Sequence, residues 1–279
     1  MTRASRADAI AVPDSKRLRR WPAALRAWMY PIGALVLATL IWDLAVRAFD
    51  IKPFILPPPL AVLRSIIEDF TVLLQQGWVT LEEVLAGFGL AVAVGLPLAV
   101  VVASWPLVER TTYPLFVGLQ VVPKIAIAPL FIVWFGFGMA PKIIVAFLLA
   151  IFPIVIDTVI GLRSVEMEKI YLSRSMGASR WQTLVKILLP NAMPNVFGGL
   201  KLAITFAVTG AIVGEFIGAD RGLGRAIIVA NGNLDTAALF AAVVILALMG
   251  IALFLIVEVA ERLVVRWHVS QRGVLTDGV

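Results

Sequence analysis

The chain has 279 residues, of which 61% are hydrophobic and 15% are charged, and its mean hydropathy is +0.96. Soluble domains are about half apolar and about a quarter charged, so this composition predicts a protein of the lipid bilayer. The absence of cysteine excludes disulfide frameworks, thiolate metal sites and cysteine nucleophiles. The net charge of +6 does not indicate a nucleic-acid partner, because the basic residues separate long apolar runs and form no basic face on a soluble domain.

The chain begins with a basic arm, residues 1–27, followed by an apolar run from about Trp28 to Phe49. We assign that run to a first transmembrane helix within residues 28–53. No small-residue cleavage site follows it, so we expect a retained span and not a removed signal peptide.

Residues 54–78 are predicted to hold an external amphipathic helix. The prolines Pro57 to Pro59 suit a helix start, and the residues after them place apolar side chains at helical spacing on one face. Those side chains are Leu63, Ile66, Ile67, Phe70 and Leu74. We expect this helix to lie on the outer surface as a cover over the helix bundle.

Residues 79–265 are predicted as a membrane core with five further spans, because each span needs about 20 apolar residues to cross the hydrocarbon layer. The expected spans are Val84–Trp105, Tyr113–Phe137, Ile143–Leu162, Val196–Gly218 and Thr236–Val257. Glycines in and near these spans are expected mainly to let helices pack closely. A tail of residues 266–279 follows.

The distribution of lysine and arginine predicts the topology, since cytoplasmic loops carry the excess. With the N-terminus inside, most basic residues outside the spans lie on the cytoplasmic side, in the arm, the tail and the loop that contains Arg163. Both termini are therefore expected in the cytoplasm, and residues such as Lys142 are expected on the outer side.

Charged residues inside spans each need a partner, a wet cavity or an escape to the interface. Lys124 lies near the middle of the third span, after Pro123 and close to Gln120, so one hypothesis places Gln120 and Lys124 on a solute path. The alternative is a structural lysine paired with a carboxylate or with carbonyls freed by the proline. Glu215 is a candidate partner or gate residue, and Asp157 is expected to contact Arg163 or a helix terminus.

A cytoplasmic loop, residues 163–193, is rich in helix formers although it leaves the membrane. Its pattern predicts a first short helix, a break at Gly177, and a second helix that ends at Pro190. Such a pair with an apolar stripe suits insertion into a partner's groove. It equally suits a cap under the protein's own bundle, because an apolar face does not say what buries it.

The loop resembles the signature loop of permeases of binding-protein-dependent ABC importers. Gly177 is followed, after nine residues, by Ile187, Leu189 and Pro190, which match the glycine and the I-x-L-P ending of that motif. The motif usually opens with Glu-Ala-Ala, where this chain has Tyr171-Leu172-Ser173. The resemblance implies a coupling helix that docks in an ATPase, through Tyr171, Ser173, Met176, Gly177, Ala178, Ser179, Trp181, Leu189 and Pro190.

Further motifs are similar to those of the nitrate, sulfonate and taurine permease subgroup, from about Phe54 to His268. They are Pro129-Leu130 with Trp134-Phe135-Gly136, Gly161 to Val165, Met176 to Trp181, and Gly214 to Gly218 followed by Gly222-Leu223-Gly224. The resemblance implies an all-α integral membrane protein with about six transmembrane helices, the type I ABC importer permease fold. It also implies a bacterial inner membrane location.

The same resemblance implies partners and a task. The partners are an ATP-binding cassette subunit inside, a second copy of the permease and an external solute-binding protein. The chain itself is expected to bind no cofactor and to carry out no catalysis, while ATP is used by the partner subunit. The implied solutes are small anionic or polar compounds, such as sulfonates, taurine or nitrate, or vitamin-precursor heterocycles.

The residues alone fit two other functional classes less well. The sequence has no G-x-x-x-x-G-K-[ST] motif, so a phosphate loop is absent and energy must come from another polypeptide or an ion gradient. An ion-driven secondary transporter would be expected to repeat the long inner loop, and only one copy is present. A membrane enzyme would need clustered catalytic groups, and the acidic pair Glu82 and Glu83 brings no nucleophile or cofactor motif.

Overall fold

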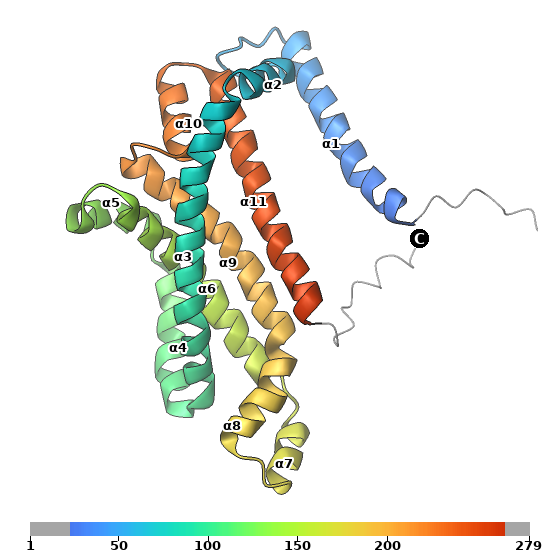
Figure 1. The fold of residues 1–279 in the computed structure, drawn as a ribbon, viewed down its shortest axis with the longest axis vertical. Helices are drawn as coiled ribbons and strands as arrows, with labels where there is room; N and C mark the ends of the chain where they lie inside the picture. The colour runs from blue at the N-terminus through green and yellow to red at the C-terminus, as the bar shows by residue number, and fades with distance from the viewer. Residues whose placement is uncertain (1–22, 266–279) are drawn as a thin grey trace, which may run out of the picture. The chain divides into compact units, whose positions relative to one another are not determined.

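The computed structural model describes residues 23–265, and all regular elements within that range are helical. The chain divides into two compact units. The first, which ends at Lys52, contains helix α1 (Ala23–Ala48). The second begins at Pro53 and contains all the other helices of Figure 1.

Four long helices form the frame of the second unit: α3 (Phe70–Ser104), α6 (Met139–Arg163), α9 (Leu189–Gly218) and α11 (Thr236–Val264). The shorter helices are α2 (Pro59–Glu68), α4 (Pro106–Val121), α5 (Lys124–Phe135), α7 (Met167–Ser175), α8 (Arg180–Thr183) and α10 (Leu223–Gly232). Within the second unit, α7 and α8 lie at one end, and α2 and α10 lie at the other (Figure 1).

Five helical stretches in the described range are long and apolar enough to cross a membrane, and a sixth is counted if α4 and α5 form one broken span. The predicted number of about six spans is therefore confirmed by length and composition. The predicted second and fifth spans are longer than expected, because α3 and α9 extend beyond the apolar runs by several turns.

Helix α6 is the centre of the second unit, packed between α3 and α9. A Cβ added at Gly87 or Gly210 would lie 2.5 Å from an atom of Ala146, and one at Gly214 would lie 2.8 Å from the Cα of Lys142. Glycine thus allows the three backbones to approach closely, as was predicted for these residues. The surrounding core is made of alanine, valine and isoleucine side chains from the same helices.

The predicted third span corresponds to two helices and not to one continuous helix. Helix α4 ends at Val121, α5 begins at Lys124, and the two helices are bent by 91°. Val122 has an extended backbone, with ψ at 126°, because the ring of Pro123 disfavours the helical conformation of the residue before it. Backbone groups opened at membrane depth are tolerated only within protein or beside a wet cavity.

A helix forms within the segment predicted to hold the amphipathic helix, but it differs from the prediction in extent and in the face that is buried. Helix α2 ends at Glu68, so Phe70 and Leu74 belong to α3. The buried residue of α2 is Val62, whereas Leu63 and Ile67 are exposed. The side of α2 that contains Val62 faces inward because α2 packs against α11.

Pro190 does not end the second helix of the loop. The chain passes from α8 through a π-helical segment, Leu184–Leu188, directly into α9, in whose first turn Pro190 lies. Proline lacks an N–H group and would leave an acceptor unpaired in a regular α-helix. The wider π turn, in which the N–H of Leu189 donates to the carbonyl of Leu184, lets the helix continue.

Candidate functional site

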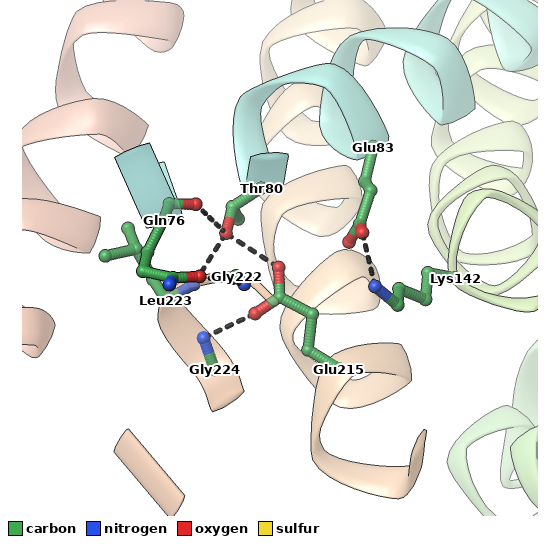
Figure 2. A network of polar contacts seen from close by, with 8 residues as sticks. All are labelled: Gln76, Thr80, Glu83, Lys142, Glu215, Gly222, Leu223 and Gly224. Atoms are coloured by element: carbon green, nitrogen blue, oxygen red, sulfur yellow. Dashed lines mark hydrogen bonds and ion pairs between the residues drawn. The ribbon is translucent and has the colours of Figure 1, made fainter. Parts of the chain in front are cut away.

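Two regions of the second unit concentrate functional chemistry, one at each end. At the end away from α7 and α8, polar side chains from α3, α6 and α9 are buried among the helices and reach the start of α10 (Figure 2). We call this set the polar cluster. It consists of Gln76, Thr80, Glu83, Lys142, Glu215 and the backbone of Gly222 to Gly224.

Glu215 is only 1% exposed, and both of its carboxylate oxygens accept hydrogen bonds. Thr80 donates to Oε1 at 2.6 Å, and the N–H of Gly224 donates to Oε2. A Cβ added at Gly222 would overlap the carboxylate of Glu215. Gly222 also has a φ of +118°, which favours glycine. The glycines therefore let the backbone at the start of α10 close over Glu215.

Thr80 joins α3 to the same turn. Its hydroxyl accepts a hydrogen bond from the N–H of Leu223 at 2.9 Å while it donates to Glu215. One turn earlier, Oε1 of Gln76 accepts from the N–H of Gly222 at 2.6 Å. These bonds satisfy the first N–H groups of α10, which have no partner inside the helix.

Lys142 and Glu83 form a buried ion pair beside this network. Nζ of Lys142 lies 2.6 Å from Oε1 of Glu83, and the two side chains are 6% and 0% exposed. The other oxygen of Glu83 is buried without a hydrogen-bond partner among the described residues. Removing one member of such a pair leaves a buried uncompensated charge, which is strongly destabilising.

Sequence reasoning missed this pair. It placed Lys142 on the outer side of the membrane and treated Glu82 with Glu83 as an outer acidic pair, without joining Lys142 to Glu83. In the structure Glu82 instead accepts a hydrogen bond from the indole of Trp78, one turn away on α3. The available signal was a glutamate and a lysine at the edges of two long apolar runs, but nothing in the sequence joined them.

Lys124 and Gln120 meet at the break between α4 and α5. Nζ of Lys124 donates to the carbonyl oxygen of Gln120 at 3.2 Å and lies 4.3 Å from the centroid of the Phe152 ring. The lysine therefore binds a carbonyl in the last turn of α4, where a cation is favourable. The structure brings Gln120 and Lys124 together, whereas the recorded contacts of Glu215 are all within the polar cluster.

Two further ion pairs connect the spans. Lys201 of α9 lies 2.8 Å from a carboxylate oxygen of Glu261 on α11, and both side chains are mostly buried. Arg163 at the end of α6 pairs with Glu109 of α4. Two alternatives were predicted for Asp157, a contact with Arg163 or with a helix terminus. The first is not formed among the described residues, because Arg163 pairs with Glu109, and Asp157 lies against Gly199 of α9.

The second region is the loop between α6 and α9, which turns at Gly177. Gly177 has a φ of +80°, and its N–H donates to the carbonyl of Arg174 while the N–H of Ala178 donates to that of Ser173. This bond pair is the Schellman motif, which closes a helix with glycine in the left-handed conformation. The predicted break at Gly177 is confirmed.

Hydrogen bonds within the loop fix its conformation. Ser179 caps α8 through a reciprocal pair of hydrogen bonds with Gln182. The hydroxyls of Ser173 and Thr183 are 3.2 Å apart and buried, and they join α7 to α8. Ser173 and Ser179 therefore hold the loop's shape. Leu189 packs beside a small core around Leu162.

Large apolar side chains of the loop are exposed. Met176 is 79% exposed, Trp181 is 70% exposed, and Tyr171 and Leu172 are each more than half exposed. Four such side chains on one short loop form an apolar surface of the kind that marks an interaction site. Within residues 23–265 no group of three His, Cys, Asp or Glu side chains could hold a metal ion.

Comparison with known proteins identifies the family. Residues 91–268 match the profile of the binding-protein-dependent transport system inner membrane component. The riboflavin transport system permease protein RibX of Chloroflexus aurantiacus is 37% identical and aligns with 92% of this chain and 96% of its own length. The formylaminopyrimidine transport permease protein ThiX of Halalkalibacterium halodurans is 33% identical over 86% of this chain and 96% of its own length.

A third relative is the taurine transport system permease protein TauC of Escherichia coli, 30% identical over 91% of this chain and 95% of its own length. In fold, the chain resembles a subunit of the MetNI methionine ABC transporter in inward-facing conformations, with a TM-score of 0.59, 23% identity, and coverage of 71% of this chain and 97% of the other. The chain therefore belongs to the binding-protein-dependent transport system inner membrane components, and it is a membrane-spanning permease subunit of an ABC importer.

Proposed function

We propose that this permease pairs with a second copy of itself, binds two ATPase subunits at its cytoplasmic face and receives solute from an external binding protein. Both termini and the loop around Gly177 then lie in the cytoplasm, as the excess of lysine and arginine there favours. The observation that carries the proposal is the exposed apolar surface of the loop, which nothing within residues 23–265 covers.

The ATPase is the partner that suits this surface. A short helical pair with apolar side chains at its tip is a shape that docks in a groove of another protein. Tyr171, Leu172 and Met176 supply the apolar contact, and Gly177 shapes the turn that presents them. The permease contributes no bond chemistry, and ATP is bound and hydrolysed by the partner.

Movement of the loop would pass directly into the spans. Helix α8 continues through the π-helical segment into α9, and α9 is packed against α6 at glycine contacts. Closely packed elements shift between discrete arrangements and do not deform continuously. Closure of the ATPase pair on ATP would therefore turn the spans outward to receive solute, and hydrolysis would reset them.

The break between α4 and α5 is our candidate for the solute path, with Gln120 and Lys124 at its corner. Broken helices near mid-membrane are where transporters commonly bind their solutes. Lys124 is already held by a carbonyl and an aromatic ring, so its ammonium group is positioned and only partly neutralised. Glu215 would serve the gate indirectly, by holding α3, α9 and α10 together at the other end.

For the solute we favour a nitrogen heterocycle of the vitamin or vitamin-precursor type. Two relatives named for such compounds, riboflavin and formylaminopyrimidine, are 37% and 33% identical to this chain. A second candidate is a small sulfonate such as taurine, because the named taurine permease is 30% identical over 91% of the chain. Uptake of labelled riboflavin, formylaminopyrimidine and taurine by cells that express the complete importer would separate the two.

Docking is tested by pull-down of the tagged permease with the ATPase subunit. Tyr171→Asp with Met176→Asp should abolish co-purification, because two carboxylates would be buried in an apolar interface. Leu234→Asp is the matched control, since Leu234 is 70% exposed at the other end of the second unit. Normal ATPase recovery with the double variant would refute the docking assignment.

Topology has its own test, because the natural chain contains no cysteine. Single variants Met176→Cys and Leu234→Cys should react differently with a membrane-impermeant maleimide applied to intact cells. Leu234→Cys should be labelled from outside, and Met176→Cys only after the cells are opened. The reverse result would invert the proposed orientation.

A further inference from the structure

A groove separates the coupling loop from the spans above it. It has a volume of about 710 Å³ and is bounded by the last turns of α3 and α6 on one side and by α7, α8 and the π-helical segment on the other. We call it the loop groove. Its volume falls in the range of about 300–1,000 Å³ that is typical of sites for small ligands.

The walls of the loop groove are largely aliphatic. Val101 lies one turn before the end of α3, Leu162 one residue before the end of α6, and Leu188 at the end of the π-helical segment. Because Val101 and Leu162 lie in the last turns of membrane-spanning helices, the groove lies where the hydrocarbon layer meets water. An occupant with an apolar part can therefore enter it from the bilayer.

Two arginines and two tryptophans complete the lining. Arg174 and Arg180 are exposed, and neither forms an ion pair within residues 23–265. Trp105 and Trp181 are also mostly exposed. Tryptophan is enriched at membrane interfaces, where its amphipathic ring sits at headgroup level. The groove thus combines an apolar wall with two free cations at interfacial depth.

We propose that the loop groove binds an anionic phospholipid of the cytoplasmic leaflet. Its phosphate would pair with Arg174 and Arg180, and an acyl chain would lie against Val101 and Leu162. Basic pockets at the cytoplasmic ends of spans are suited to such headgroups. The aliphatic wall favours a lipid over a soluble anion, which would leave that wall wet. The inference rests on the cytoplasmic placement of the loop proposed above.

The lipid site and the ATPase contact use different residues of the loop. Tyr171, Leu172 and Met176 do not line the groove, so they stay available to the ATPase. Ala178 and Trp181 do line it, although resemblance alone would assign both to docking. A bound lipid would fill the space behind the loop and fix its angle to α3, so that motion of the ATPase reaches the spans.

The test is native mass spectrometry of the purified importer complex incubated with phosphatidylglycerol or with phosphatidylcholine. Arg174→Gln with Arg180→Gln should weaken phosphatidylglycerol binding about 25-fold, since each basic residue near an anionic headgroup contributes about a fivefold factor. Arg174→Lys with Arg180→Lys should keep most of the binding. Arg221→Gln with Arg225→Gln, the same charge change at exposed positions near α10, should leave it unchanged.

A second arm measures solute-stimulated ATP hydrolysis in vesicles of phosphatidylcholine alone and in equimolar phosphatidylcholine and phosphatidylglycerol. The wild-type complex should be stimulated more strongly in the mixed vesicles, and the glutamine variant should lose that difference while its ATPase still co-purifies. Equal phosphatidylglycerol binding by wild type and the glutamine variant would overturn the lipid site. Displacement of the lipid by glycerol phosphate would also overturn it, in favour of a soluble anion. If the ATPase subunit does not co-purify with the wild-type permease, the proposed docking is refuted. Binding of phosphatidylglycerol to the permease alone then still tests the loop groove.

Discussion

The polar cluster and the coupling loop are opposite in character. The polar cluster places carboxylates, an ammonium group and a hydroxyl inside the helix bundle, where Glu83 and Glu215 are at most 1% exposed. The loop around Gly177 leaves methionine, tryptophan and tyrosine side chains exposed. The polar cluster is thus buried and paired within the second unit, whereas the large apolar side chains of the loop are not covered by the described residues.

This difference indicates that the polar cluster and the loop have different roles. Buried polar groups with specific partners fix one arrangement of α3, α6, α9 and α10, because any other arrangement leaves charges unpaired. Exposed apolar groups on a short, internally braced loop keep their shape but gain free energy only when another protein covers them. We expect substitutions in the polar cluster to change stability, and substitutions in the loop to change coupling.

The largest effect is expected for Lys142→Met, which leaves Glu83 buried without its cation. Loss of one member of a buried pair destabilises a protein by about 3–5 kcal/mol. The free energy of unfolding of the purified permease should fall by that amount in a denaturant titration. Glu83→Leu with Lys142→Met should recover much of it, while Lys169→Met, which removes an exposed pair with Glu166, should change it by less than about 1 kcal/mol. An unaltered Lys142→Met protein would show that the ion pair does not hold the cluster.

Gly222→Ala should have the next largest effect. The added methyl group would meet the carboxylate of Glu215, and the φ of +118° is strained for alanine, which together cost about 2–3 kcal/mol. Gly232→Ala, at the end of the same helix, meets nothing within 4 Å and should be neutral. Thermal unfolding of the two variants in one detergent makes the comparison. The same midpoint of thermal unfolding for both variants would mean that α10 can move away from Glu215 without cost.

Gly177→Val tests the loop. A β-branched residue at a φ of +80° costs about 1–2 kcal/mol, although the space around Gly177 is open. We expect insertion and midpoint of unfolding to stay near wild type, while solute uptake per ATP hydrolysed falls severalfold. Gly177→Asn should behave almost normally, because asparagine tolerates the left-handed conformation. Normal coupling in the valine variant would show that the turn at Gly177 has no role in the transport cycle.

The smallest stability effect is expected for Lys124→Met. Its contact with Phe152 is worth about 0.5–1 kcal/mol, so assembly with the ATPase should be retained. Uptake should still fall severalfold if the break between α4 and α5 lines the path. Lys201→Met, whose partner Glu261 joins α9 to α11, provides the contrast, since it should reduce stability more than uptake at equal expression. Wild-type uptake by Lys124→Met would assign Lys124 to structure alone.

The sequence was informative where local chemistry decides the structure. Apolar runs located the long helices, Gly177 located the turn, and small residues marked the contacts around α6. It was least informative where distant segments meet. Glu83 and Lys142 are 59 residues apart and Thr80 and Glu215 are 135 apart, so only the packing of α3, α6 and α9 brings them together.

The predicted helix end at Pro190 was the other error, and it arose because proline has opposite effects in two places of this chain. Before Pro123 the chain leaves the helical conformation and turns through 91°, whereas at Pro190 it stays helical. The difference lies in the preceding turn, which widens to a π-helical one only in the second case. A pattern of apolar residues contains no information on that widening.

The π-helical segment also accommodates one residue without changing the rotational phase between the loop and the membrane. A π turn holds about one residue more than an α turn and still completes a single rotation, whereas each residue of a regular α-helix rotates it by about 100°. Deletion of one residue between Leu184 and Leu188 would therefore restore a regular helix and leave α7 and α8 at nearly the same angle around the axis of α9. Deletion of one residue from the regular part of α9 would instead turn them by about 100°, so the direction in which Met176 points tolerates a change of length in the π-helical segment and not outside it.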